Sequence, residues 1–122
     1  MRFLFKISMP VEAGNADAKN GFSAIRSILA QQKPEAVYFA SEGGKRAAYL
    51  FIHMDDLSQL PAIAEPWFLA LNASIDVAPV MTPEDLMKAA PAVEQAVKAY
   101  WQAAGTRSDA LRRYADRESL ER

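Results

Sequence analysis

Four polar side chains that can take part in acid–base chemistry lie in apolar segments of this sequence: Lys6, Tyr49, His53 and Asp76. His53 is the only histidine, and a histidine can act as a general acid or base near neutral pH. If Lys6 and Asp76 share one buried surface, each charge must be paired, and together they could orient a polar ligand or polarise a carbonyl. We therefore take these four residues as candidate catalytic residues.

Each of these candidates also has a purely structural interpretation. His53 can form a hydrogen bond at an interface or lie at a strand end in solvent. Lys6 and Asp76 can form a structural ion pair, which need not add stability. The residue types alone leave both interpretations open.

Four further side chains are candidates for binding a ligand. Tyr38, Phe51 and Trp67 have large apolar rings suited to the wall of a pocket, and two of them carry a polar tip. Arg46 could reach an anionic group on the same ligand. The alternative for the aromatic residues is packing in a core or interface, and the alternative for Arg46 is a solvated position at a strand end.

Several kinds of catalytic or binding site have no support in the sequence. There is no cysteine, which excludes disulfides, thiolate nucleophiles and thiolate metal ligands. No Gly-x-Ser-x-Gly nucleophile motif, phosphate-binding loop or His-x-x-His pair occurs. We therefore expect no cofactor and no metal ion.

Composition limits the class of protein further. The chain of 122 residues, with 51% hydrophobic and 24% charged residues, fits a globular domain with its own core. A net charge of -1 argues against nucleic acid binding, which needs a basic excess or a basic stripe. No apolar run approaches membrane-spanning length, and the first residues lack the pattern of a signal peptide. We expect no nucleic acid partner, no membrane contact and a cytoplasmic location.

The elements that must position these candidates are organised around a β-hairpin predicted for residues 36–54. Two apolar runs flank Gly43 and Gly44, and glycine adopts the positive φ that tight hairpin turns require. With that turn, Tyr38 opposes Tyr49, and opposed residues share a face of the sheet. One face is aliphatic and holds Val37, Phe39, Ala48, Leu50 and Ile52, whereas the other is aromatic with polar tips and holds Tyr38, Ala40, Ala47, Tyr49, Phe51 and His53.

Two more strands complete the predicted sheet. Residues 2–9 alternate with period two, which indicates a half-buried strand. Residues 74–81 predict a fourth strand, and Pro79 within it favours a position at the edge of the sheet.

Two helices are predicted between these strands. Apolar residues recur every three to four positions over 14–32, which predicts one helix, with Asn15 or Asp17 as its cap. The same spacing predicts a second helix over 56–71. Because proline disrupts a helix interior, we expect this helix to be kinked or restarted near Pro66.

A third helix should follow the last strand. Thr82 is a favourable N-cap and Pro83 a favourable first helical residue. We expect a break near Pro91 and an end at Gly105. The charged segment 105–122 is expected to be a tail or a short helix, which leaves 1–104 as the folded domain.

The order of these elements predicts a ferredoxin-like α+β fold. Strand, helix, strand, strand, helix, strand is the split βαβ arrangement, here with an additional C-terminal helix. Right-handed crossovers place strands 2–9 and 45–53 in the middle of a four-stranded antiparallel sheet, with helices on one face. The covered face should hold Phe3, Phe5, Ile7, Val37, Phe39, Leu50, Ile52, Ile75 and Val77.

The opposite face, which we call the uncovered face, should lack helices. It holds Leu4, Lys6, Ser8, Tyr38, Ala40, Tyr49, Phe51, His53, Asp76 and Ala78. Three large aromatic rings in one exposed patch usually mark an interaction surface. The simplest closed solution is a two-fold homodimer whose uncovered faces stack into a barrel, with a small apolar organic molecule as a possible ligand inside.

Three segments of the chain resemble the dimeric α+β barrel superfamily: MRFLFKIS, FASEGGKRAAYLFIHMDD and PWFLALNASIDVAPVMTPEDL. This superfamily includes muconolactone isomerases, antibiotic-biosynthesis-type monooxygenases and small stress-induced barrel proteins. The last segment is similar to the end of a small bacterial family of unknown function in that superfamily. The resemblance covers residues 1–101 and implies the fold and a homodimer, but it transfers no catalytic set.

If the protein is an enzyme, the resemblance implies cofactor-free isomerase or monooxygenase-like chemistry on a small cyclic organic compound. The first candidate residues would then be His53, Tyr49, Lys6 and Asp76. The competing hypothesis is a non-catalytic structural or protein-interaction module, whose barrel is filled by its own side chains.

Overall fold

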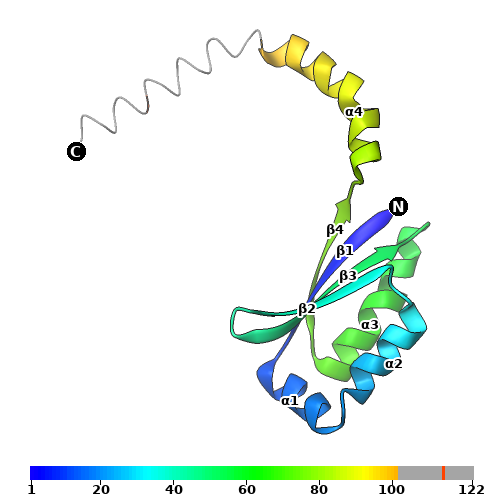
Figure 1. Ribbon diagram of the computed structural model, residues 1–122, viewed down its shortest axis with the longest axis vertical. Helices are drawn as coiled ribbons and strands as arrows, with labels where there is room; N and C mark the ends of the chain where they lie inside the picture. The colour runs from blue at the N-terminus through cyan, green and yellow to red at the C-terminus, as the bar shows by residue number, and fades with distance from the viewer. Residues whose placement is uncertain (102–113, 115–122) are drawn as a thin grey trace. The chain divides into compact units, whose positions relative to one another are not determined.

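The computed structural model describes residues 1–101 and 114. It divides into two compact units, Met1–Val80 and Met81–Arg122. The first unit contains a four-stranded antiparallel sheet of order β2-β3-β1-β4, with its helices on one face (Figure 1). In chain order its elements are β1 (Arg2–Met9), α1 (Val11–Lys19), α2 (Ser23–Gln32), β2 (Ala36–Glu42), β3 (Lys45–His53), the 3₁₀ helix η1 (Leu57–Gln59), α3 (Leu60–Leu71) and β4 (Ser74–Val80).

The strand order confirms the predicted α+β fold with ferredoxin-like topology. β1 and β3 are the central strands, and β2 and β4 are the edges. The hairpin is also as predicted, because Gly43 and Gly44 have φ of 62° and 76°, and Tyr38 pairs with Tyr49. A two-residue turn determines which residues of the two strands pair, so the position of Gly43 and Gly44 determines the register of this hairpin.

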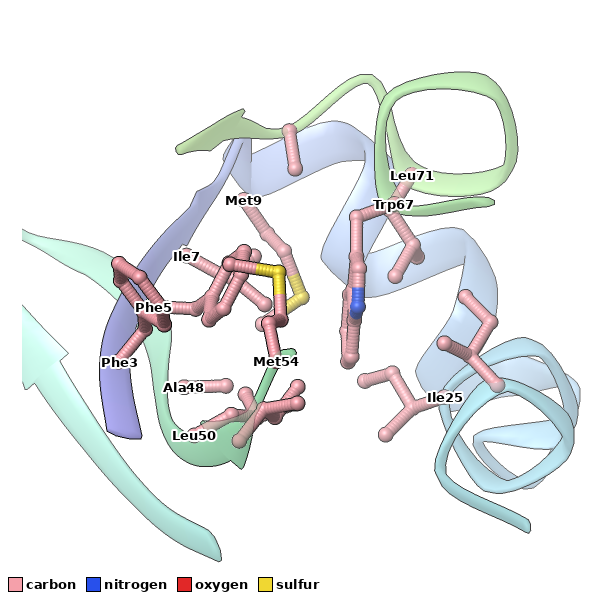
Figure 2. Close-up of a cluster of buried hydrophobic side chains, with 13 residues drawn as sticks. Phe3, Phe5, Ile7, Met9, Ile25, Ala48, Leu50, Met54, Trp67 and Leu71 are labelled. Carbon is pink, nitrogen blue, oxygen red and sulfur yellow. The ribbon is translucent and has the colours of Figure 1, made fainter. Parts of the chain in front are cut away.

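The core lies between the central strands and the helices. Phe5, Leu50 and Trp67 are each 0% exposed. The Trp67 ring of α3 lies between side chains of the strands and Ile25 of α2 (Figure 2). The side chain of Gln32 accepts a hydrogen bond from Trp67 Nε1 (3.1 Å) and donates one to the Ile63 carbonyl (2.7 Å). The N–H group of the buried indole therefore has a hydrogen-bond partner.

The edge strands are less covered than the sequence pattern predicts. On the predicted covered face, the side chains of β1 and β3 are buried, but Phe39 of β2 is 58% exposed and Val77 of β4 is 38% exposed. Alternation identifies the face that a side chain occupies, whereas its burial depends on how far the helices extend across the sheet. Among the four strands, every buried side chain lies on the two central strands.

The helix predicted over 14–32 is wrong in two respects, because the segment forms two helices and the first begins at Val11. Gly21 and Phe22 have φ of 66° and 57°, a left-handed conformation that no helix can continue through. Asp17 does not cap the start of its own helix. Its buried carboxylate accepts the backbone N–H of Ala24 (3.0 Å) and Ile25 (3.2 Å), and so caps α2 from α1.

Of the two outcomes predicted near Pro66, a kink or a restart, the restart is wrong. Pro66 lies inside α3, which is continuous from Leu60 to Leu71. A proline removes one helical hydrogen bond, and here the buried side chains of Ala64, Trp67 and Leu71 hold the helix against the core. The change of helix type occurs earlier instead, where η1 gives way to α3.

The second unit begins with α4 (Pro83–Ala96), followed by the π-helix η2 (Val97–Trp101). Thr82 caps α4 as predicted, since its hydroxyl accepts the Asp85 N–H and the Asp85 carboxylate accepts the Thr82 N–H, both at 3.1 Å. The break predicted near Pro91 is wrong, because α4 runs through it. The predicted end at Gly105 and the segment 105–122, apart from Tyr114, lie outside the described residues. No described helix is long and apolar enough to cross a membrane.

Candidate functional site

Three of the four candidate catalytic residues lie in one row across the uncovered face. Lys6 of β1 pairs with Asp76 of β4 on one side and with Tyr49 of β3 on the other. Tyr49 in turn pairs with Tyr38 of β2. The row therefore crosses all four strands, and residues directly opposite in an antiparallel sheet have Cβ atoms about 5 Å apart.

Glu42, which the sequence analysis did not select, joins Lys6 and Tyr49 into a polar cluster. Lys6 Nζ lies 3.3 Å from Glu42 Oε1, and the Tyr49 hydroxyl donates a hydrogen bond to Glu42 Oε2. Lys6 Nζ also lies 5.8 Å from the centre of the Tyr49 ring, within cation–π range. We call Lys6, Glu42 and Tyr49 the strand-face cluster.

The strand-face cluster sets the protonation states of its members. The hydrogen bond from Tyr49, together with the bond and charge of Lys6, holds the pKa of the Glu42 carboxyl below its usual value of 4.5. The same hydrogen bond to Glu42 raises the pKa of the Tyr49 phenol above 10.0. At neutral pH, Glu42 is therefore a carboxylate and Tyr49 a neutral phenol, so Tyr49 serves as a hydrogen-bond donor and not as a base.

Asp76 lies beside the strand-face cluster without joining it. Lys6 forms its ion pair with Glu42, and within residues 1–101 and 114 Asp76 has no ion pair. A hollow of about 190 Å³ is lined by Lys6, Ser8, Glu42 and Asp76, among others. Two carboxylates and one ammonium group thus border this hollow, and they suit hydrogen-bonding groups on a ligand.

His53 is separate from the cluster. It lies at the end of β3 opposite Arg2, four residues from Tyr49, which corresponds to about 13 Å along a strand. Its Nε2 lies 2.8 Å from Asp55 Oδ1, its Nδ1 lies 3.3 Å from the Met1 nitrogen, and its side chain is 55% exposed. The structure therefore does not bring His53 to Lys6 and Asp76.

The four candidate ligand-binding residues also divide between the two faces. Tyr38 is exposed and Phe51 is half-buried on the uncovered face. Trp67 is fully buried in the core, the alternative considered for it above. Arg46 lies on the helix side of the sheet, where its Nη1 donates a hydrogen bond to Asn15 Oδ1 (2.8 Å).

A second cavity in the first unit, larger than the hollow beside Asp76, was not expected from the sequence. It has a volume of about 580 Å³ and lies between α2 and the hairpin, on the face of the sheet opposite the strand-face cluster. Phe22, at the break between α1 and α2, forms one of its walls. The prediction of one unbroken helix over 14–32 therefore could not indicate this cavity. We call it the α2 cavity, defined by Met9, Phe22, Ile25, Arg26, Leu29, Phe39, Ala40, Ser41, Arg46 and Ala47.

Comparisons with known proteins add no family to these observations. No protein family model matches the chain, and no curated protein matches it either. Among the described residues, no group of three or more His, Asp or Glu side chains is arranged to hold a metal ion. The function must therefore be argued from the site itself.

Proposed function

We propose that the protein is a small-molecule-binding homodimer in which the uncovered faces of two copies stack and enclose the ligand. The observation that carries this proposal is the row Tyr38, Tyr49, Lys6 and Asp76, with Glu42 bridging two of its members. No helix of Met1–Val80 covers this row (Figure 1). A polar row flanked by aromatic rings suits a binding surface better than a solvated one.

The apolar part of the uncovered face supports self-association. Tyr38 is 62% exposed, and Leu4 and Phe51, which pair across β1 and β3, are only half-buried. Stacking two copies about a two-fold axis would bury these side chains against their own equivalents. Such an interface is self-complementary, so one chain suffices to form it.

The strand-face cluster and its hollow suggest the ligand class. The rings of Tyr38 and Tyr49 on the same face favour a small cyclic organic compound, and the polar groups of Lys6 and Asp76 would hydrogen-bond its carbonyl or hydroxyl groups. If the complex is catalytic, the resemblance to the superfamily suggests cofactor-free isomerase or monooxygenase-like chemistry. Tyr49, Lys6 and Asp76 would then act together, with His53 at the rim.

One observation favours the alternative of a non-catalytic interaction module. Glu42 already accepts hydrogen bonds from both Lys6 and Tyr49, so the cluster satisfies itself without a ligand. A self-satisfied polar network can instead fix the register of a protein interface. The two functions differ in whether a void remains between the stacked sheets.

Measurement of mass in solution tests the proposal directly. We expect light scattering to give a dimer for the native chain and a monomer for Tyr38→Asp, because two carboxylates would face each other in the interface. Leu69→Asp is the matched control, since Leu69 of α3 is 82% exposed on the helix side of the sheet. A native monomer at micromolar concentration contradicts the proposal, and so does a dimer that Leu69→Asp dissociates but Tyr38→Asp does not.

Native mass spectrometry of the purified protein tests the ligand. A bound organic molecule that is lost in Lys6→Met supports small-molecule binding. If the native and Lys6→Met proteins are both dimers without any bound molecule, the result supports the interaction module.

A further inference from the structure

The α2 cavity has the size and lining of a binding site separate from the uncovered face. Its volume of about 580 Å³ lies within the range of pockets that enclose small ligands. Phe22, Ile25, Leu29 and Phe39 give it apolar walls. Phe22 and Phe39 are 41% and 58% exposed, so a large apolar surface is left unburied at its mouth.

The charges around the α2 cavity are of one sign. Arg26 and Arg46 line it together with the hydroxyl of Ser41, and no acidic residue is among its walls. Arg26 donates to the Gly21 carbonyl (3.4 Å) and Arg46 to the Asn15 side chain (2.8 Å), both of them neutral acceptors. Within the part of the chain that the structure describes, neither guanidinium has a carboxylate partner. Each guanidinium carries five N–H donors, so most remain available to an anion.

Arg46 is also held in place at the cavity wall. Its side chain passes over Gly14 of α1, where a Cβ atom would lie 3.0 Å from Arg46 Nη1 and 3.2 Å from its Cδ. The missing side chain at Gly14 therefore makes room for the guanidinium, and Asn15 fixes its position. A charged group fixed before the ligand arrives loses little entropy on binding.

We propose that the α2 cavity binds a small amphipathic anion, with its apolar chain or ring between α2 and β2 and its carboxylate at Arg46 and Arg26. Apolar walls account for the body of such a ligand, and two guanidinium groups without acidic neighbours account for its charge. This proposal is independent of the uncovered face and of the dimer.

Calorimetric titration with three probes of equal chain length tests the charge requirement. We expect decanoate to bind, and decanol and decyltrimethylammonium to bind at least tenfold more weakly, since a charge-assisted hydrogen bond contributes about that factor. Decanoate and decyltrimethylammonium are kept below the concentrations at which they form micelles, and decanol is kept below its solubility limit. Equal binding of decanol and decanoate, or no binding of decanoate, overturns the proposal.

Substitutions at the cavity separate its two cationic groups from general surface charge. Arg46→Gln and Arg26→Gln should each weaken decanoate binding about five- to tenfold. Lys45→Gln removes the same charge from the residue next to Arg46, outside the cavity wall, and should change binding less than twofold. Gly14→Ala keeps every charge and shifts the Arg46 side chain by only a few tenths of an ångström, so it should weaken binding less than Arg46→Gln does.

Backbone amide chemical shifts locate the bound probe and guard against misfolded variants. Decanoate should shift the amides of Phe22, Phe39 and Arg46, and leave those of Lys6 and Phe51 unchanged. Shifts confined to Lys6 and Phe51 would overturn this proposal while supporting ligand binding at the uncovered face. If Arg46→Gln perturbs the spectrum of the free protein, Arg26→Gln decides, because Arg26 is exposed on α2.

Discussion

The two faces of the sheet are made by alternate residues of the same strands, yet they differ in how their side chains are satisfied. On the helix side, Phe5 and Leu50 are 0% exposed and belong to the hydrophobic core. On the uncovered face, Lys6 and Tyr49 occupy equivalent central positions, but they are half-buried and bonded to Glu42. The comparison shows that a central strand position does not make a side chain part of the core, because burial requires a second layer.

This difference also separates what maintains the fold from what could bind a partner. The helix side carries the apolar burial that stabilises the first unit. On the uncovered face of a single copy, Leu4, Tyr49 and Phe51 are only half-buried, so they keep apolar surface for the interface proposed above. The α2 cavity lies on the helix side, beside the edge strand β2, which the helices do not fully cover.

The largest expected effect on the free energy of unfolding distinguishes Leu50 from Phe51, neighbouring residues of β3 whose side chains lie on opposite faces of the sheet. Leu50→Ala should lower the free energy of unfolding by about 2–5 kcal/mol, because it leaves a cavity in the packed core. Phe51→Ala, with a larger ring removed, should cost a single copy less than Leu50→Ala, since Phe51 is only half-buried. Urea denaturation at a protein concentration low enough to dissociate any dimer measures both. A larger loss for Phe51→Ala would show that the uncovered face is part of the core.

A smaller effect on stability is expected from Asp17, the one buried carboxylate among residues 1–101. Asp17→Ala should lower the free energy of unfolding by about 1–2 kcal/mol, because it removes the cap of α2 and leaves the N–H groups of Ala24 and Ile25 unpaired. Asp17→Asn keeps an acceptor oxygen and should lose less. Glu65→Ala, at an exposed position of α3, is the control for the loss of one negative charge. Equal stability of the Asp17→Ala and native proteins would contradict this capping role.

Much of the sheet could be predicted from the sequence because its signals are local. Gly43 and Gly44 determine the turn, the turn determines the register, and alternation then assigns each residue to a face. The helix break at Gly21 could not be read in the same way. The apolar spacing continues across it, so period alone cannot distinguish one helix from two with a shared buried side.

The candidate site was predictable only in part, for a related reason. Strand pairing places Lys6, Tyr49 and Asp76 in one row, and the sequence analysis placed them on one face. The hairpin register pairs Glu42 with Lys45, whereas the Glu42 side chain reaches along the sheet to Tyr49 and Lys6. Long side chains lean along the strand direction, and pairing rules do not include that reach.

The smallest expected effect is a titration within the strand-face cluster. The pKa of Glu42 lies below 4.5 because Tyr49 and Lys6 bond its charged form. Since this folded-state pKa is below the unfolded one, the cluster stabilises the fold fully above the unfolded pKa, and this stabilisation is lost as the pH falls through the folded pKa. Carbon-detected NMR titration of the Glu42 carboxyl should show its pKa rising toward 4.5 in Tyr49→Phe, and rising also in Lys6→Met. Tyr38→Phe, on the same face but outside the cluster, should leave it unchanged. A Glu42 pKa that does not respond to Tyr49→Phe would mean that the cluster does not persist in solution. The uncovered face would then not differ from the helix side by a bonded polar cluster.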